Sequence, residues 1–220
     1  MGRKLPIKEA TWARLTECNR AAVEEGWASP GVFATGIGPE YDPKGDLGLL
    51  YVGKSAGPLG TLVGSGSDQI ASGSASTRWM VEKRNKSAFW QMVDLLDPSR
   101  RRIAWTNICK MDEVGGNRPP PMHRWQAISE PHRQALIEEI KCLSPRVIIF
   151  ATSGYCGDTV SEVLEELGYG SQLLNFRDGY TRLTATPGGA FAIETRHPQG
   201  WPKPERNRVV GLARKLLHQA

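Results

Sequence analysis

The sequence predicts an α/β fold built around a mainly parallel sheet. Two short segments, Leu47–Val52 and Val147–Ala151, are apolar or almost wholly so, which is typical of strands that are covered on both faces. Arg102–Ile108 is a further strand candidate between them. Segments with helical spacing of apolar residues stand before, between and after them. Strands that alternate with helices favour a parallel sheet with right-handed crossover connections.

The helical segments are defined by apolar residues that recur every three to four positions. The first runs from Ile7 to Glu25 and ends at Gly26, a residue typical of helix ends. The others are expected at Ser87–Leu96, Glu130–Leu143, Asp158–Leu167 and Glu205–His218. Three further strands with a weaker pattern are expected at Gln172–Phe176, Tyr180–Thr184 and Phe191–Thr195.

Three segments have the composition of loops. A Gly/Pro-rich connector spans Ser29–Gly45, and Gly115–Pro121 is a rigid loop that ends in three prolines. Glycine and serine dominate Gly57–Thr77, a composition that favours a mobile or ligand-shaped loop over a packed element.

Length and composition indicate one domain. A chain of 220 residues with 40% hydrophobic content can bury a stable core without disulfides or a structural metal. We therefore expect residues 1–220 to form a single domain, with an N-terminal helix and connector at 1–46 and a core at 47–220. No apolar stretch approaches the roughly 18 residues of a membrane helix, and the first residues lack the apolar centre of a secretory signal. These features predict a cytoplasmic protein without a membrane partner.

The charge balance is basic. Lys and Arg number 28 against 23 Asp and Glu, and the sequence pI is near 9.1, which suits a polyanionic partner such as DNA. Many of the basic residues flank the loops described below: Arg78, Lys83, Arg84, Lys86, Arg100, Arg101, Arg102, Arg118, Arg196, Lys203, Arg206 and Arg208. A solvated basic face without a partner is the alternative. No dimer surface is evident in the sequence, and we expect a monomer.

The four cysteines are Cys18, Cys109, Cys142 and Cys156, and none forms a C-x-x-C pair or a Cys/His cluster. Free thiols in a reducing compartment are expected, with no metal and no cofactor.

Three loops follow predicted strands, at the edge of a parallel sheet where ligands bind. The first, Gly53-Lys-Ser-Ala-Gly-Pro-Leu-Gly60, has glycines that let the backbone approach a ligand, and it matches neither nucleotide-phosphate motif. In the second, Asn107 offers an acceptor and two donors that can read the amide edge of a base, or it ties down a turn. In the third, His197 can donate to a developing negative charge, and the neighbouring prolines stiffen the loop.

These three loops together resemble the uracil-DNA glycosylase superfamily. The first loop is similar to its motif one, including the form found in single-strand-selective monofunctional uracil glycosylases. The order Thr106-Asn107-Ile-Cys-Lys110, then Gly116-Asn117-Arg118-Pro-Pro120, then an apolar strand is closest to the family-four branch, and His197-Pro198 stands where the superfamily carries its H-P motif. The resemblance spans Leu47 to Leu217 and implies a three-layer α/β/α fold with a central, mainly parallel four-stranded sheet.

The resemblance also implies roles for individual residues. Asn107 would hydrogen-bond a flipped base, His197 would stabilise the leaving base, Ser55 stands where many members position the attacking water, and Trp201 would fill the gap in the duplex. The base pocket would be lined by Gly53, Lys54, Ala56, Gly57, Leu62 and Asn107. DNA contacts would come from Lys110, Asn117, Arg118, Gln199, Trp201, Lys203 and Arg206.

Several positions depart from the family pattern. Lys54 stands where family four has a Glu, and Ser55 is a poorer water activator than a carboxylate. Leu62 replaces an expected base-stacking aromatic, which favours a roomier pocket, and Met111 stands where the family-four cluster has a Cys.

The sequence therefore predicts a monofunctional DNA glycosylase that acts in base excision by base flipping. Its substrate would be a damaged or modified base, such as a bulky modified pyrimidine in foreign or phage DNA, and its role DNA repair or phage defence. Three alternatives stay open: a catalytically weak or inactive protein that binds DNA or modified bases, a lyase that uses Lys54 as a Schiff-base nucleophile, and an α/β hydrolase or transferase acting on free nucleosides.

Overall fold

The computed structural model describes residues 5–55, 68–82, 87–115, 120–155, 158–170, 174–175 and 181–218. Its centre is four parallel strands in the order β3 (Ile103–Asn107), β2 (Leu49–Gly53), β4 (Val147–Ala151) and β7 (Phe191–Thr195). Every residue of the first three is buried, as the apolar sequences of β2 and β4 predict, and in β3 the burial includes the polar Thr106 and Asn107. The predicted α/β class with parallel central strands is confirmed.

The sheet is wider than the four strands expected. A short strand β1 (Gly36–Ile37) pairs antiparallel with β3, and β6 (Arg182–Ala185) and β5 (Leu174–Asn175) extend the other side, also antiparallel. The described chain thus forms a mixed seven-stranded sheet in the order β1-β3-β2-β4-β7-β6-β5. The four-stranded prediction, which came from the family resemblance, is wrong. Strands β5 and β6 overlap the weaker strand segments expected at Gln172–Phe176 and Tyr180–Thr184. Strand β1 was not expected, because two residues are too few to show a periodic pattern and only its pairing with β3 defines it.

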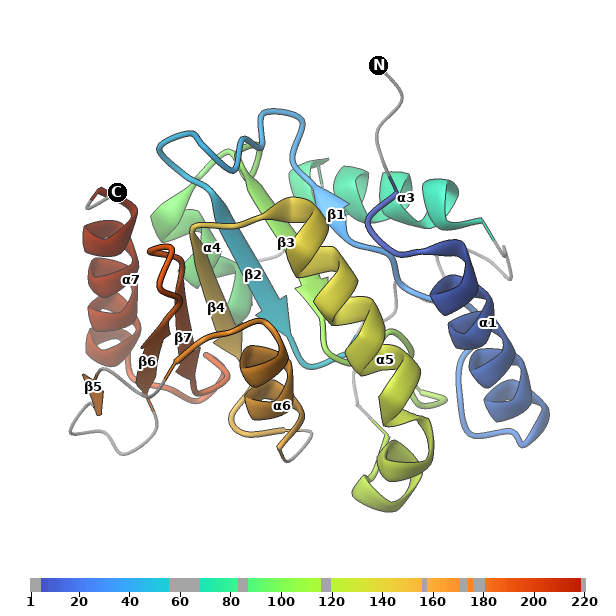
Figure 1. Cartoon of the computed structure of the whole chain (residues 1–220). Coiled ribbons are helices and arrows are strands. Elements are labelled where there is room, and N and C mark those ends of the chain that lie inside the picture. The colour runs from blue at the N-terminus through green and yellow to red at the C-terminus, as the bar shows by residue number, and fades with distance from the viewer. Residues whose placement is uncertain are drawn as a thin grey trace.

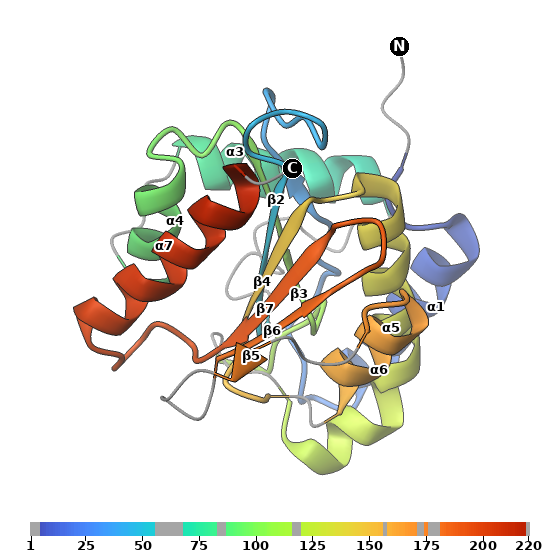
Figure 2. The same cartoon turned by 60° about the vertical axis from the view of Figure 1, so that its left-hand side comes forward.

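Helices cover both faces of the sheet (Figures 1 and 2). On one face, α5 (Met122–Leu143) and α6 (Thr159–Glu166) pack on the even-numbered side chains of β2 and β4, and α1 (Glu9–Glu24) packs outside α5. On the other face lie α3 (Gln69–Glu82), α4 (Ala88–Leu96) and α7 (Lys203–His218), against the odd-numbered side chains. Strand alternation therefore divides the core into two apolar layers.

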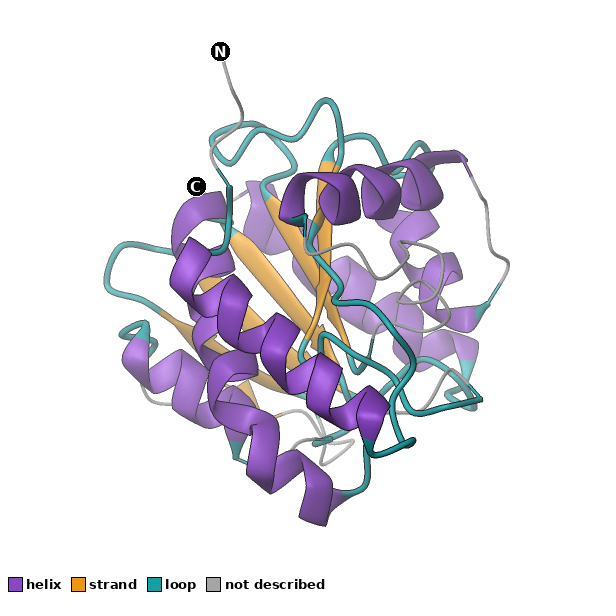
Figure 3. Cartoon of the chain, turned by 90° about the vertical axis from the view of Figure 1, so that its right-hand side faces the viewer, coloured by secondary structure: helices purple, strands orange, loops and turns teal. Residues whose placement is uncertain are grey.

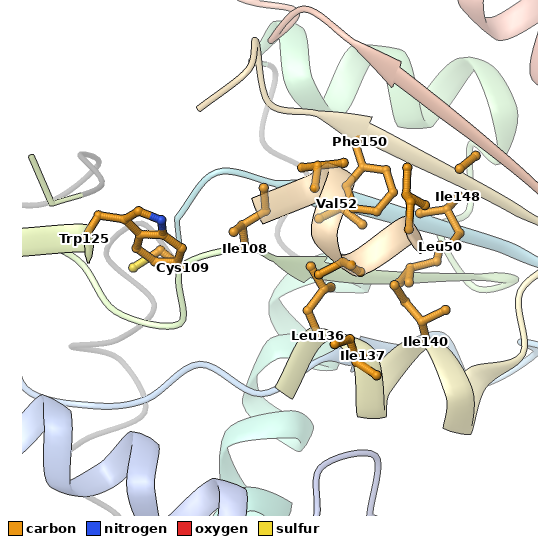
Figure 4. Packing of buried hydrophobic residues seen from close by; sticks show 14 of the residues in the cluster. Leu50, Val52, Ile108, Cys109, Trp125, Leu136, Ile137, Ile140, Ile148 and Phe150 are labelled. Carbon is orange, nitrogen blue, oxygen red and sulfur yellow. The ribbon is translucent and has the colours of Figure 1, made fainter. Parts of the chain in front are cut away.

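The layer under α5 shows how the pattern works. Leu50 and Val52 of β2 and Ile148 and Phe150 of β4 face the helix, which presents Leu136, Ile137 and Ile140 toward them (Figure 4). All are buried, and apolar burial of this kind is the main favourable term in folding. The helix begins at Met122, eight residues before the predicted start, and runs through the buried Pro131.

The glycine- and serine-rich segment contains a helix where a loop was expected. Residues 56–67 lie outside the described residues, but Gln69–Glu82 forms α3, which lies along β1 (Figure 3). The hydroxyl of Ser72 accepts from the Ala34 amide (2.9 Å) and donates to the Val32 carbonyl (2.8 Å). A Cβ at Gly36 would lie 3.1 Å from the Ser76 backbone. Small residues here serve close packing of a helix on an edge strand.

Candidate functional site

The carboxyl ends of the four parallel strands meet at one edge of the sheet, the edge at which ligands bind in open α/β folds (Figure 1). Two of the turns there are hydrogen-bonded to each other. The Ile108 amide donates to the Gly53 carbonyl and the Cys109 amide to the Lys54 carbonyl, both at 2.9 Å. The described starts of the predicted first and second loops, at Gly53–Lys54 and Ile108–Cys109, are therefore joined to each other.

Gly53 and Asn107 are in direct contact at this junction. A Cβ at Gly53 would overlap the Asn107 carboxamide and lie 3.2 Å from the Phe89 ring, so only glycine fits. With its amide group oriented to satisfy its neighbours, the Asn107 side chain donates to the carbonyl oxygens of Ser55 (3.0 Å) and Thr106 (3.2 Å). Asn107 is 1% exposed, so its carboxamide is held rigidly at the base of the site.

Phe89 of α4 connects these residues to the third loop. Its ring contacts the position above Gly53 and lies nearly parallel to the His197 imidazole, with the ring centres 5.8 Å apart and an interplanar angle of 22°. A further ring, Tyr51 of β2, supports it at 4.5 Å. One aromatic side chain therefore spans the distance between Asn107 and His197. The sequence predicts only that Phe89 lies in the helix expected at Ser87–Leu96 and does not predict its position in the site, because only tertiary packing brings α4 to this edge.

His197 is held in one tautomer. Its Nδ1 accepts the amide N–H of Gln199 at 3.3 Å, so in the neutral ring the proton resides on Nε2, which is then a donor. Burial, and after it the positive charge of Lys54, lowers the pKa of His197 to about 4. The imidazole is therefore neutral at physiological pH. Its own backbone amide donates to the Ser153 hydroxyl in the turn after β4, at 2.6 Å.

Two of the predicted DNA contacts are buried. Lys110 is 0% exposed, and its ammonium lies 2.5 Å from Glu139 and 2.6 Å from the Thr106 hydroxyl. Trp201 is 7% exposed and belongs to the apolar layer between the sheet and α4 and α7. The expectations that Lys110 contacts DNA and that Trp201 enters the duplex are corrected here, because both side chains face the core.

The remaining predicted contacts divide in two groups. Gln199 and Lys203 are exposed, and Arg206 is half-buried at the start of α7, where it donates to Gln91 of α4 at 3.3 Å. These three lie on the same side as Phe89. The others, Ala56, Gly57, Leu62, Asn117 and Arg118, lie outside the described residues.

A cavity of about 340 Å³ lies beside the His197 loop, at the α6 side of the sheet. Its polar lining comprises Thr152, Ser153, Asp158, Ser161, Arg182, Glu194, Thr195 and Arg196. Burial raises the pKa of Glu194, while Arg182 opposes the shift. No motif in the sequence pointed to this cavity, because its side chains come from four separate segments.

The described part of the chain holds no group of three or more His, Cys, Asp or Glu side chains able to bind a metal ion. Within the same residues, no helix is both long and apolar enough to cross a bilayer. Cys18 and Cys109 are free thiols, and Cys156 lies outside the described residues.

Comparison with protein-family models and with curated proteins finds no match to this chain. Its function is therefore argued from the site alone.

Proposed function

We propose that the protein is a DNA glycosylase that binds an extruded base and hydrolyses its N-glycosidic bond. The observation that carries the proposal is the row formed by Asn107, Phe89 and His197 at the carboxyl edge of the sheet. A carboxamide, an aromatic face and a neutral imidazole donor are the three groups needed to hydrogen-bond, stack and polarise a nucleobase.

The proposed chemistry is electrostatic. As the bond between C1′ and the base nitrogen breaks, its electrons move to the base and negative charge grows on a base carbonyl. His197 Nε2–H donates to that oxygen, and Lys54, which is close enough to lower the His197 pKa, places a positive charge nearby. Water attacks the cationic sugar. The neutral His197 ring can fill this role because Nδ1 accepts the Gln199 amide, which leaves the proton on Nε2 as the donor.

Ser55 is the proposed residue for orienting the water. Its carbonyl oxygen accepts from the Asn107 carboxamide, so the turn that carries it is fixed relative to the base-reading group. A hydroxyl activates water less well than a carboxylate does. We therefore assign most of the rate enhancement to His197 and Lys54 rather than to a general base.

The proposed substrate is a damaged or modified base, including a bulky modified pyrimidine in phage or other foreign DNA. The support is the replacement of an expected aromatic by Leu62, which leaves Phe89 as the aromatic face in the described part of the site. Duplexes that carry uracil, hypoxanthine, hydroxymethylcytosine or glycosylated hydroxymethylcytosine test this choice. A clean preference for plain uracil would contradict it.

The proposed mechanism is tested by removing the oxyanion donor. His197→Ala should lower the single-turnover rate of base release by about 10²- to 10³-fold, because one preorganised donor is lost. Abasic sites are measured by alkaline strand cleavage. The matched control is His218→Ala, an exposed histidine in the last turn of α7, which should leave the rate unchanged. Release by His197→Ala at the wild-type rate would refute this mechanism.

A second candidate function is a DNA- or modified-base-binding protein with weak or no catalysis. It is favoured by Lys54 and Ser55, which stand where a water-activating carboxylate is expected. Tight binding without release of free base would identify it. In both cases, contacts by Lys203 and Arg206 to phosphates should make the affinity fall steeply as salt rises, whereas an enzyme of free nucleosides would show no DNA affinity.

A further inference from the structure

The turn after β4 contains a serine in a backbone conformation that favours glycine. Ser153 has a φ of +57°, in the left-handed region, and the next residue, Gly154, has a φ of +68°. The structure therefore places serine where glycine would be less strained. Strained backbone of this kind clusters at functional sites, which raises the question of what the hydroxyl contributes.

The hydroxyl of Ser153 is the acceptor for the backbone amide of His197, at 2.6 Å. The same turn is attached to the end of β7, because the amides of Thr152 and Ser153 both donate to the Thr195 carbonyl, at 3.2 and 3.1 Å. The turn after β4 thus holds the chain at residues 195–197 through three hydrogen bonds. Two of these bonds join main-chain groups, and the third uses the Ser153 hydroxyl as its acceptor.

The third bond acts at the residue whose ring is proposed to polarise the base. The imidazole is constrained from its other side, where the Gln199 amide donates to Nδ1. We propose that Ser153 is a positioning residue for His197, which holds the histidine backbone so that the ring faces Phe89 and presents Nε2–H to the base. The proposal rests on the proposed function of His197.

Opposite effects on stability and on rate provide the test. Ser153→Gly removes the hydroxyl and keeps the left-handed conformation, while Ser153→Thr keeps the hydroxyl but places a β-branched residue at positive φ. Ser144→Gly is the matched control. Ser144 also has a positive φ, of +47°, and its hydroxyl donates to the Lys141 carbonyl at the end of α5, at the opposite edge of the sheet.

We expect Ser153→Gly to melt at or above the wild-type temperature and yet to release base about 10- to 100-fold more slowly, with the loss in kcat rather than KM. Ser153→Thr should melt at a lower temperature and retain most of its kcat. Ser144→Gly should keep the wild-type rate. A Ser153→Gly variant with wild-type kcat would overturn the proposal.

A second readout does not depend on activity. The imidazole signals of His197, followed by NMR titration, should show a pKa near 4 in the wild type and a rise toward 6.5 in Ser153→Gly, as the ring gains contact with water. Lys54 is the charged group that also acts on this ring, and it is unchanged in all variants. If the wild type releases no base, the proposed function fails. The titration then decides alone: a shift supports positioning by Ser153, and an unchanged titration overturns it.

Discussion

At the scale of the residue, the charge of His197 is set by its surroundings rather than by its own chemistry. An ordinary histidine is half protonated near pH 6.5, but burial and Lys54 lower the pKa of this one to about 4. The ring therefore stays a neutral donor across the physiological range. In the proposed mechanism Lys54 has two effects, since it adds to the effect of burial in keeping the imidazole neutral and would place positive charge where a leaving base gains electrons.

A pH profile of base release tests this coupling. The rate should show no loss near pH 6.5 and should fall only as the pH approaches about 4, where His197 becomes protonated. Lys54→Gln removes the charge that lowers the pKa, so the acidic limb should move to higher pH. Lys54→Arg keeps the charge and should keep the limb in place. Identical acidic limbs in all three proteins would contradict the coupling.

Gly53 shows how residue-level expectations and structure differ. The glycines of the first loop were expected to allow close approach to a ligand. At Gly53 the close neighbour is instead the Asn107 carboxamide, with the Phe89 ring at 3.2 Å from the position of a Cβ. The glycine thus lets two protein side chains meet, and those side chains then form the site.

At the scale of the element, β3 and the turn after it are attached to α5 by buried polar contacts. Lys110 forms an ion pair with Glu139, both 0% exposed, and Glu139 also accepts from Thr106 at 2.8 Å. The Lys110 amide donates to His132 Nδ1 at 2.9 Å. Because Asn107 lies between Thr106 and Lys110, these contacts also fix the backbone that carries the Asn107 side chain, the group proposed to read the base.

Removing one member of this ion pair should be costly. Lys110→Met leaves the Glu139 carboxylate buried without its partner and should lower the free energy of unfolding by about 3–5 kcal/mol. The double variant Lys110→Met/Glu139→Leu should recover most of that loss, since no buried charge remains. Urea denaturation measures both. Lys141→Met is the control: its pair with Glu166 is exposed, with a nitrogen–oxygen distance of 3.9 Å, and its loss should change the free energy of unfolding by about 1 kcal/mol or less. If the double variant were no more stable than Lys110→Met, the loss could not be assigned to the unpaired Glu139 carboxylate.

At the scale of the whole molecule, two histidines link folding to pH. Burial lowers the pKa of His132 to about 3, with Lys110 adding to the shift, and His197 is lowered to about 4. In the unfolded chain both should titrate near 6.5. Each therefore contributes stability that is fully present above pH 6.5 and is lost as the pH falls toward the folded-state pKa.

The stability of the protein should consequently fall between pH 6.5 and about 3. His132→Asn keeps an acceptor for the Lys110 amide but cannot take up a proton, so this variant should be less stable at neutral pH and should lose less stability on acidification. The change in the urea unfolding midpoint between pH 7 and pH 5 measures how much stability each protein loses on acidification. An equal change in the wild type and in His132→Asn would show that protonation of His132 is not the cause of the loss.

Most elements of the fold could be predicted from the sequence. Fully apolar runs such as Leu49–Gly53 and Val147–Ala151, and amphipathic segments such as Ala88–Leu96, have periodicities that belong to one element type only. Where the prediction failed, composition was ambiguous. The serines of α3 favour a loop on local grounds, and only their hydrogen bonds to residues 32–34 show that they pack a helix.

From the sequence alone follow the central strands, most of the helices, and the loops that carry Gly53, Asn107 and His197, because apolar periodicity and strand-to-loop order are local properties of the chain. Only the tertiary structure decided which side chains in and around those loops are available to a ligand. Lys110 and Trp201, expected to contact DNA, lie in the core, while Phe89 and Ser153, which were not expected there, lie in the site. Burial and hydrogen bonding could not be predicted for them because both depend on neighbours distant in sequence. The protonation state of His197 also depends on distant residues. The ring is neutral because it is buried and because Lys54, 143 positions earlier (197 − 54) in the chain, lies close to it.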